Sequence, residues 1–159
     1  MASIDLAQVS MERAHYDNLF DPITGLPTGW VLLIDRLEMA LARSRRTGSL
    51  VAVFVLDRPR LLSDERIDFG YAIQSLRRQL RSDDTLAKIG EDRLVIVCAD
   101  VVDDAEAAAM ALRIVHDSGV TCSLGVALGG ASDTSDQVLA RGIAAATAEF
   151  ADEPHAAVG

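Results

Sequence analysis

Two short arginine clusters have the residue types that bind an anion. They are the stretches "RSRR" at 43–46 and "RRQLR" at 77–81. The whole chain carries a formal net charge of -9, so an anionic ligand would need such a local cluster to hold it. The same charge argues against bulk nucleic acid as a partner, because binding a phosphate backbone requires an excess of lysine and arginine.

A tight polar turn, Gly90-Glu91-Asp92-Arg93, joins two apolar runs at 84–89 and 93–99. This pattern predicts an antiparallel hairpin in which Gly90 supplies the backbone freedom of the turn. Two acids followed by an arginine suit an active-site turn, and they suit an ordinary solvent-exposed turn equally well. The residue types alone leave both interpretations open.

Other residue types give no catalytic set. The three histidines, His15, His116 and His155, fall on separate predicted elements, and no serine or cysteine lies in a nucleophile-elbow pattern. Cys98 and Cys122 each lie inside an apolar run, which favours small hydrophobic side chains over a disulfide or metal pair.

The elements that must position these residues form an α+β pattern. Half of the 159 residues are apolar and only 4% are aromatic, which suits a layered core of aliphatic side chains. We expect a leading helix in 1–20, one domain over 21–151 and a flexible tail over 152–159. Hydrophobic periodicity predicts helices at 30–46, 67–81, 103–116 and 135–150, strands at 49–57 and 120–130, and the hairpin between them. The expected architecture is a central mixed or antiparallel sheet covered by helices.

No run is long enough to span a bilayer, and the first residues include acids without an apolar stretch of signal-peptide length. We therefore expect a cytoplasmic protein without membrane insertion.

Three separated stretches resemble one family, the GGDEF domains, whose active members are diguanylate cyclases that join two GTP molecules into cyclic di-GMP (c-di-GMP). Asp21 with "TGLP" resembles the family's opening motif. The stretch "VFVLDRPR" followed by "FGY" resembles its D-x-D-x-F-K and F-G-H segments, and "DDTLAKIGEDRLVIV" with "CSLGVA" resembles its signature hairpin and following strand. The resemblance implies a ferredoxin-related nucleotidyl-cyclase fold over about 21–150.

The resemblance also implies a metal site. Asp57, at the end of its strand, matches the family's first metal ligand, and Asp92 matches the acid at the third position of the signature. In active members these carboxylates hold Mg²⁺ against triphosphate oxygens, because this hard cation prefers oxygen ligands. Asp57 and Asp92 are thus the candidate metal ligands and Mg²⁺ the candidate cofactor.

The remaining positions of the signature argue against turnover. Glu91 adds a negative charge where the family has a glycine that approaches phosphate, and Arg93 replaces the family's catalytic Glu. Arginine neither coordinates a metal nor accepts a proton at neutral pH. Pro59 replaces the second Asp of D-x-D, Glu65 falls near the Asn that reads guanine, and Phe150 falls near a phosphate-binding Lys. We therefore expect no catalytic residues and a degenerate, non-cyclising domain.

A ligand site is implied at "RSDD", 81–84, which matches the family's inhibitory R-x-x-D pattern. In members that bind c-di-GMP there, the arginine binds phosphate and guanine, while the aspartate accepts hydrogen bonds from the guanine edge. Arg81 and Asp84 are the candidate ligand-binding residues, with charge added by Arg78 and Arg77. The alternative is a solvated helix end, because a helix that ends in arginine followed by a polar turn is also what capping produces.

Three further functions remain open at this point. The domain would be a nucleotide-independent module that binds a protein partner or a second copy of itself, a regulatory domain that binds GTP with Mg²⁺ through Asp57 and Asp92, or a weak residual diguanylate cyclase.

Overall fold

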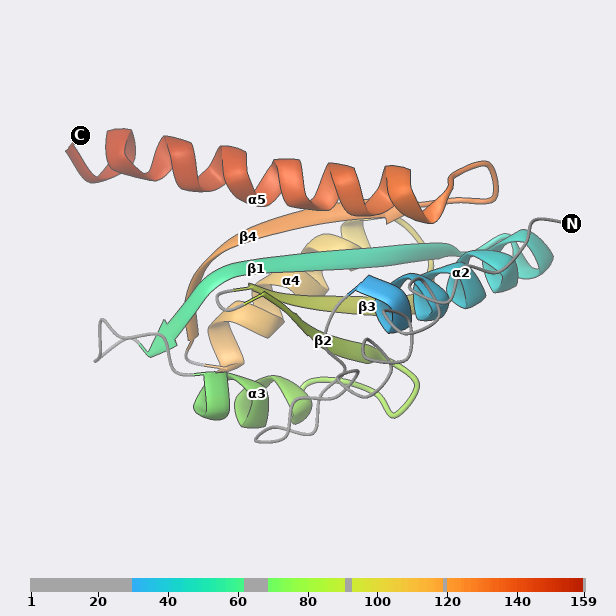
Figure 1. The fold of residues 1–159 in the computed structure, drawn as a ribbon, viewed down its shortest axis with the longest axis horizontal. Coiled ribbons are helices and arrows are strands. Elements are labelled where there is room, and N and C mark those ends of the chain that lie inside the picture. The colour runs from blue at the N-terminus through green and yellow to red at the C-terminus, as the bar shows by residue number, and fades with distance from the viewer. Residues whose placement is uncertain (1–29, 62–68, 91–92, 119, 159) are drawn as a thin grey trace, which may run out of the picture.

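The computed structural model describes residues 30–61, 69–90, 93–118 and 120–158. The leading helix expected in 1–20 lies outside these residues, as do Glu91, Asp92 and Glu65. The described part contains helices and strands in the order α2 (Trp30–Thr47), β1 (Leu50–Leu61), α3 (Phe69–Arg77), β2 (Thr85–Ile89), β3 (Arg93–Val101), α4 (Asp104–Ser118), β4 (Val120–Gly129) and α5 (Ser135–Val158) (Figure 1).

The four described strands form one sheet in the order β2-β3-β1-β4, and all of their pairings are antiparallel. The central strand β1 is the continuous apolar run of the sequence, as expected for a strand buried on both faces. The β2–β3 hairpin has the predicted form, with Gly90 at a φ of 69°. The expected α+β fold with a sheet covered by helices is confirmed.

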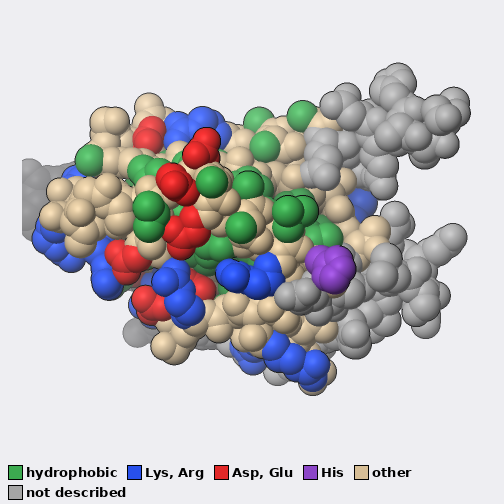
Figure 2. Space-filling view, turned by 180° about the vertical axis from the view of Figure 1, so that it is seen from behind, with side chains coloured by type: hydrophobic (Ala, Val, Ile, Leu, Met, Phe, Trp, Pro, Cys, Tyr) green, Lys and Arg blue, Asp and Glu red, His purple; other side chains and the backbone are tan. Residues whose placement is uncertain are grey.

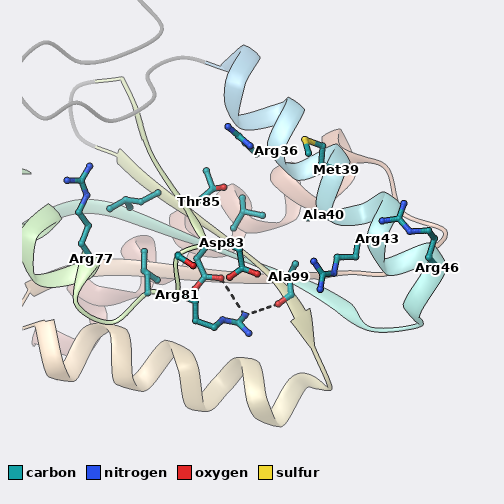
Figure 3. Close-up of a pocket in the computed structure, with 15 residues that line it drawn as sticks. Arg36, Met39, Ala40, Arg43, Arg46, Arg77, Arg81, Asp83, Thr85 and Ala99 are labelled. Carbon is teal, nitrogen blue, oxygen red and sulfur yellow. Dashed lines mark hydrogen bonds and ion pairs between the residues drawn. The ribbon is translucent and has the colours of Figure 1, made fainter.

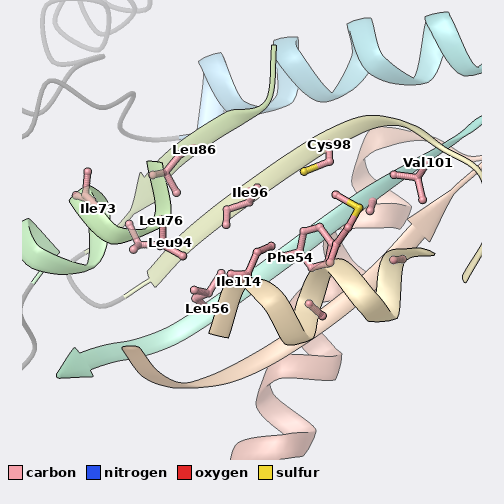
Figure 4. Close-up of a cluster of buried hydrophobic side chains, with 14 residues drawn as sticks. Phe54, Leu56, Ile73, Leu76, Leu86, Leu94, Ile96, Cys98, Val101 and Ile114 are labelled. Carbon is pink, nitrogen blue, oxygen red and sulfur yellow. The ribbon is translucent and has the colours of Figure 1, made fainter. Parts of the chain in front are cut away.

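Alternate side chains of β1 pack into two hydrophobic cores, one on each face of the sheet. Ala52, Phe54 and Leu56 pack with α3 and α4 on one face of the sheet (Figure 4). The neighbouring residues Val51, Val53 and Val55 pack with α2 and α5 on the other. Since strand side chains alternate between faces, a single strand thus anchors both helical layers.

On the second face, α5 lies close against β4. A Cβ atom on Gly125 would overlap the backbone of α5 at Gly142 and Ala146. The absence of a side chain at this position therefore sets how closely the helix approaches the sheet.

Two element boundaries differ from the sequence-based expectation. β1 continues past Asp57 to Leu61 through a bulge, because the pairing with β4 shifts between Asp57 and Arg60 and Arg58 has a φ of 54°. α3 ends at Arg77, since Gln79 N and Leu80 N donate to carbonyls three residues back and tighten the chain into turns.

α5 extends to Val158 and therefore includes residues 152–158, for which the flexibility expected from the sequence stays a prediction.

Both cysteines are free thiols, as expected. Within the described residues, no helix combines the length and apolar character needed to cross a bilayer. Figure 2 shows the face opposite to that of Figure 1, where acidic and basic side chains lie near one another among hydrophobic ones.

Candidate anion-binding site

A cavity of about 770 Å³ opens beside the β2 edge of the sheet, where α2 from one face approaches the turn after α3 (Figure 3). The charged side chains around it are Arg36, Arg43, Arg46, Arg77, Arg81, Asp83 and Asp84. The remaining walls include Met39 and Ala40 of α2, Thr85 and Leu86 of β2, and Val97 and Ala99 of β3.

The arginines of α2 reach the cavity because the helix is amphipathic. Leu33, Leu37 and Leu41 are fully or almost fully buried against the sheet. Arg36, Arg43 and Arg46 recur at intervals of seven and three residues, which places them along one stripe outside that buried face. Burial of the leucine stripe therefore leaves these arginines on the part of α2 that borders the cavity, and Figure 3 shows Arg43 directed toward Asp83 and Ala99.

Arg81 and Asp84 form a compact unit in the turn between α3 and β2. Asp84 Oδ2 accepts a hydrogen bond of 2.8 Å from the backbone N of Arg81, and Asp84 Oδ1 lies 3.4 Å from Arg81 Nη2. Arg81 Nη2 also donates to the carbonyl of Ala99 on β3 at 2.9 Å. The guanidinium is therefore held against the sheet by the turn and by the neighbouring strand.

The two partners differ strongly in exposure. The side chain of Asp84 is only 3% exposed, whereas that of Arg81 is 51% exposed. The carboxylate therefore forms part of the cavity wall and stabilises the turn. The guanidinium faces solvent and has further N–H donors besides those that bond to Asp84 and Ala99.

Cys98 of β3 lies beneath this turn and is fully buried. Burial, followed by the charge of Asp84 and a hydrogen bond to it, raises the pKa of the Cys98 thiol well above its ordinary value. The thiol therefore stays protonated and serves as a small buried side chain under the Asp84 carboxylate, in agreement with the sequence-based interpretation of Cys98.

The cavity is cationic in an acidic protein. Its lining has five arginines and two aspartates, which leaves three more positive than negative charges. Arg43 is partly neutralised by Asp100, whose Oδ2 lies 2.8 Å from Arg43 Nη2. Arg36, Arg46 and Arg77 have no hydrogen bond or ion pair with any described residue.

The structure brings together two segments that the sequence presented separately. Arg81 and Asp84, the predicted R-x-x-D pair, both line the cavity, and the predicted neighbour Arg77 lines it as well. Arg78, also predicted, is exposed but is not among the lining residues. The contribution of α2 was missed as part of this site, although the cluster at 43–46 had been a separate candidate for anion binding.

The signature turn gives a second charged site. Asp57 of β1 and Arg93 of β3 form an ion pair with Arg93 Nε 2.6 Å from Asp57 Oδ1. Asp92 lies outside the described residues, so the prediction that Asp57 and Asp92 share a metal ion is not tested. Within the described residues, no group of three or more His, Cys, Asp or Glu side chains is arranged to hold a metal.

Comparison with known proteins bears on the fold. No protein-family model matches the sequence, and no curated protein matches it significantly. Solved structures do match. The diguanylate cyclase SiaD of Pseudomonas aeruginosa, solved with its activator SiaC, is 21% identical with a TM-score of 0.70, and the match covers 92% of this chain and 65% of that one.

Two isolated domains match over most of their length. The GGDEF domain of YfiN (TpbB) from Pseudomonas aeruginosa is 22% identical with a TM-score of 0.70, and the match covers 82% of this chain and 87% of that one. The GGDEF domain of DgcB from Caulobacter crescentus, in complex with c-di-GMP, is 19% identical with a TM-score of 0.65, over 87% and 92% of the two chains. The chain has the fold of GGDEF domains. At this identity the likeness establishes the fold, and the function has to be argued from the site.

Proposed function

We propose that this chain is a regulatory domain of the GGDEF fold that binds c-di-GMP in the arginine-lined cavity and does not synthesise it. The observation that carries the proposal is the convergence of two arginine clusters and the Arg81–Asp84 pair on one cavity. The domain would act in the cytoplasm and pass the signal to a protein partner or a second copy of itself.

The chemistry of the cavity matches this ligand. c-di-GMP carries two phosphates and two guanines, and an arginine fork binds either a phosphate or the O6/N7 edge of guanine with two hydrogen bonds. Arg36, Arg46, Arg77 and Arg81 offer such forks around one cavity. A volume of about 770 Å³ lies in the range typical of small-molecule sites.

The signature hairpin supports the absence of synthesis. Arg93 stands where active members have a catalytic Glu, and its guanidinium faces the carboxylate of Asp57. A guanidinium cannot act as the general base that would activate the attacking hydroxyl. The proposal therefore separates ligand binding at the cavity from chemistry at the hairpin.

Calorimetric titration of the purified protein with c-di-GMP tests the binding. We expect a dissociation constant of about 1 μM or tighter, equivalent to about -8 kcal/mol or better. Arg81→Ala should weaken binding at least about tenfold through loss of a charge-assisted contact. Arg113→Ala is the matched control, because Arg113 is exposed on α4 and does not line the cavity. Equal affinity of wild type and Arg81→Ala would remove Arg81 from the site.

Two further outcomes separate the alternatives. Sustained conversion of GTP and Mg²⁺ to c-di-GMP by the wild-type protein would contradict the absence of synthesis. No binding by calorimetry or by a second probe would contradict the receptor function, and stoichiometric recovery of a protein partner without nucleotide would then favour an interaction module.

A further inference from the structure

The ion pair between Asp57 and Arg93 is built into the sheet itself. The two residues are direct cross-strand partners on β1 and β3. Arg93 Nε lies 2.6 Å from Asp57 Oδ1, and Arg93 Nη2 lies 3.5 Å from Asp57 Oδ2. Both carboxylate oxygens therefore face the same guanidinium, which is the two-point geometry of the stronger arginine–carboxylate pairs.

The pair is shielded more than an ordinary surface pair. The side chains of Arg93 and Asp57 are 26% and 16% exposed, so solvent screens their attraction only in part. The bulge of β1 follows immediately, with Arg58 in the left-handed region. A bulge redirects the side chains beside it and increases the local twist of the strand.

The described surroundings of Asp57 do not fit a divalent cation. On its other side the cross-strand partner is the buried Ser123, which supplies no carboxylate. A Mg²⁺ ion lies about 2.0–2.1 Å from its oxygen ligands, and it would meet the guanidinium that already lies 2.6 Å from Oδ1. Two cations at one carboxylate repel each other strongly in a partly shielded site.

We propose that Arg93 is the resident counter-cation of Asp57, taking the place that a metal would occupy in an active cyclase. It neutralises the carboxylate, joins β1 to the start of β3, and excludes divalent cations from Asp57. This end of the sheet is then independent of Mg²⁺. The inference concerns the hairpin alone and does not depend on whether the arginine-lined cavity binds a ligand.

Thermal unfolding with and without Mg²⁺, at matched ionic strength, tests the proposal. In the wild-type protein, Mg²⁺ should not change the thermal unfolding midpoint through Asp57. Any small response to Mg²⁺ should therefore be the same in wild type and in Asp57→Asn. Arg93→Glu places two carboxylates across the strands, and Mg²⁺ should then raise the midpoint by about 3–5 °C at tenfold excess over its dissociation constant. The gain should disappear in the double variant Asp57→Asn/Arg93→Glu.

A second variant keeps the test decisive if Arg93→Glu does not fold. Arg93→Gln removes the positive charge without adding a negative one, and Mn²⁺ titration followed by electron paramagnetic resonance should show Asp57-dependent binding at least about fivefold tighter than in wild type. A wild-type site for Mn²⁺ that Asp57→Asn abolishes would overturn the proposal. So would the absence of any cation response in both Arg93 variants, because Arg93 would then exclude nothing.

Discussion

The two Arg–Asp pairs of this domain lie toward opposite ends of β3 and have different surroundings. Arg81 bonds to Ala99 near the end of β3, and Arg93 begins the same strand. Six residues separate the two points, which corresponds to roughly 20 Å along an extended strand. The same two residue types therefore serve two sites that are far enough apart to act independently.

The difference between the pairs lies in the neighbouring charges. Around Arg81 and Asp84, three additional arginines have no partner among the described residues, and the aspartate is buried behind the arginine. At Asp57 and Arg93, the two charges satisfy each other at 2.6 Å. An ion pair surrounded by uncompensated charge of one sign attracts a ligand, whereas a balanced pair in a partly shielded site mainly supports the fold.

The largest expected effect concerns the α2 arginines. The double variant Arg36→Ala/Arg46→Ala should weaken c-di-GMP binding by about 10- to 100-fold, because two charge-assisted contacts are lost. Calorimetry at several salt concentrations should also show a weaker salt dependence, since fewer positive charges then attract the phosphates.

Arg45→Ala is the control on the same helix. Arg45 bonds to the carbonyl of Ala131 and is not a lining residue of the cavity. If Arg45→Ala and the double variant weaken binding to the same extent, Arg36 and Arg46 do not contact the ligand. The cavity would then not differ from the Asp57–Arg93 site in the way described above.

An effect of intermediate size on stability is expected when Asp84 or Asp57 is replaced by alanine. Asp84→Ala removes the hydrogen-bond acceptor of Arg81 N and the carboxylate partner of the Arg81 guanidinium, which should lower the free energy of unfolding by about 1 kcal/mol and also weaken ligand binding. Asp57→Ala should lower stability by about 1 kcal/mol or more, because Arg93 loses its partner, without changing affinity. Urea unfolding and calorimetry measure the two quantities separately, and an equal loss of affinity in both variants would contradict independent sites.

The smallest effect is expected at a third pair, Arg141 and Asp133, which is the baseline for a pair with a purely local role. The N–H of Gly130 and then the Arg141 side chain lower the pKa of Asp133 below its ordinary value of 3.8. Because the folded state then binds fewer protons than the unfolded state, this contribution is present above about pH 4 and lost as the pH falls through the folded-state pKa.

Asp133→Asn should therefore reduce stability slightly at pH 6 and progressively less toward pH 3, as followed by urea unfolding over that range. A stability difference that stays constant with pH would show that the charge of Asp133 contributes nothing. Affinity for c-di-GMP should be unchanged throughout, because Asp133 does not line the cavity.

Much of the fold could be predicted because local patterns carry it. The continuous apolar run of β1 predicts burial on both faces, and the structure places alternate residues of this strand in two cores. The leucine spacing of α2 and the glycine at position 90 likewise predict one buried helix face and one tight turn, and both are present. Periodicity and turn chemistry act over a few residues, so they can be read from the chain directly.

The sequence by itself also determined the residue types at both sites, namely the R-x-x-D pair and an arginine in the signature turn. Only the tertiary structure decided their partners. Arg36 and Arg46 lie more than thirty residues from Arg81 in the sequence, and they meet it because α2 and the turn after α3 both border β2. Arg93 meets Asp57 through the register of β1 and β3. Such long-range contacts depend on how the helical layers pack against the sheet and on the register of the strands. A pattern of residues that are close in the sequence does not specify either of these.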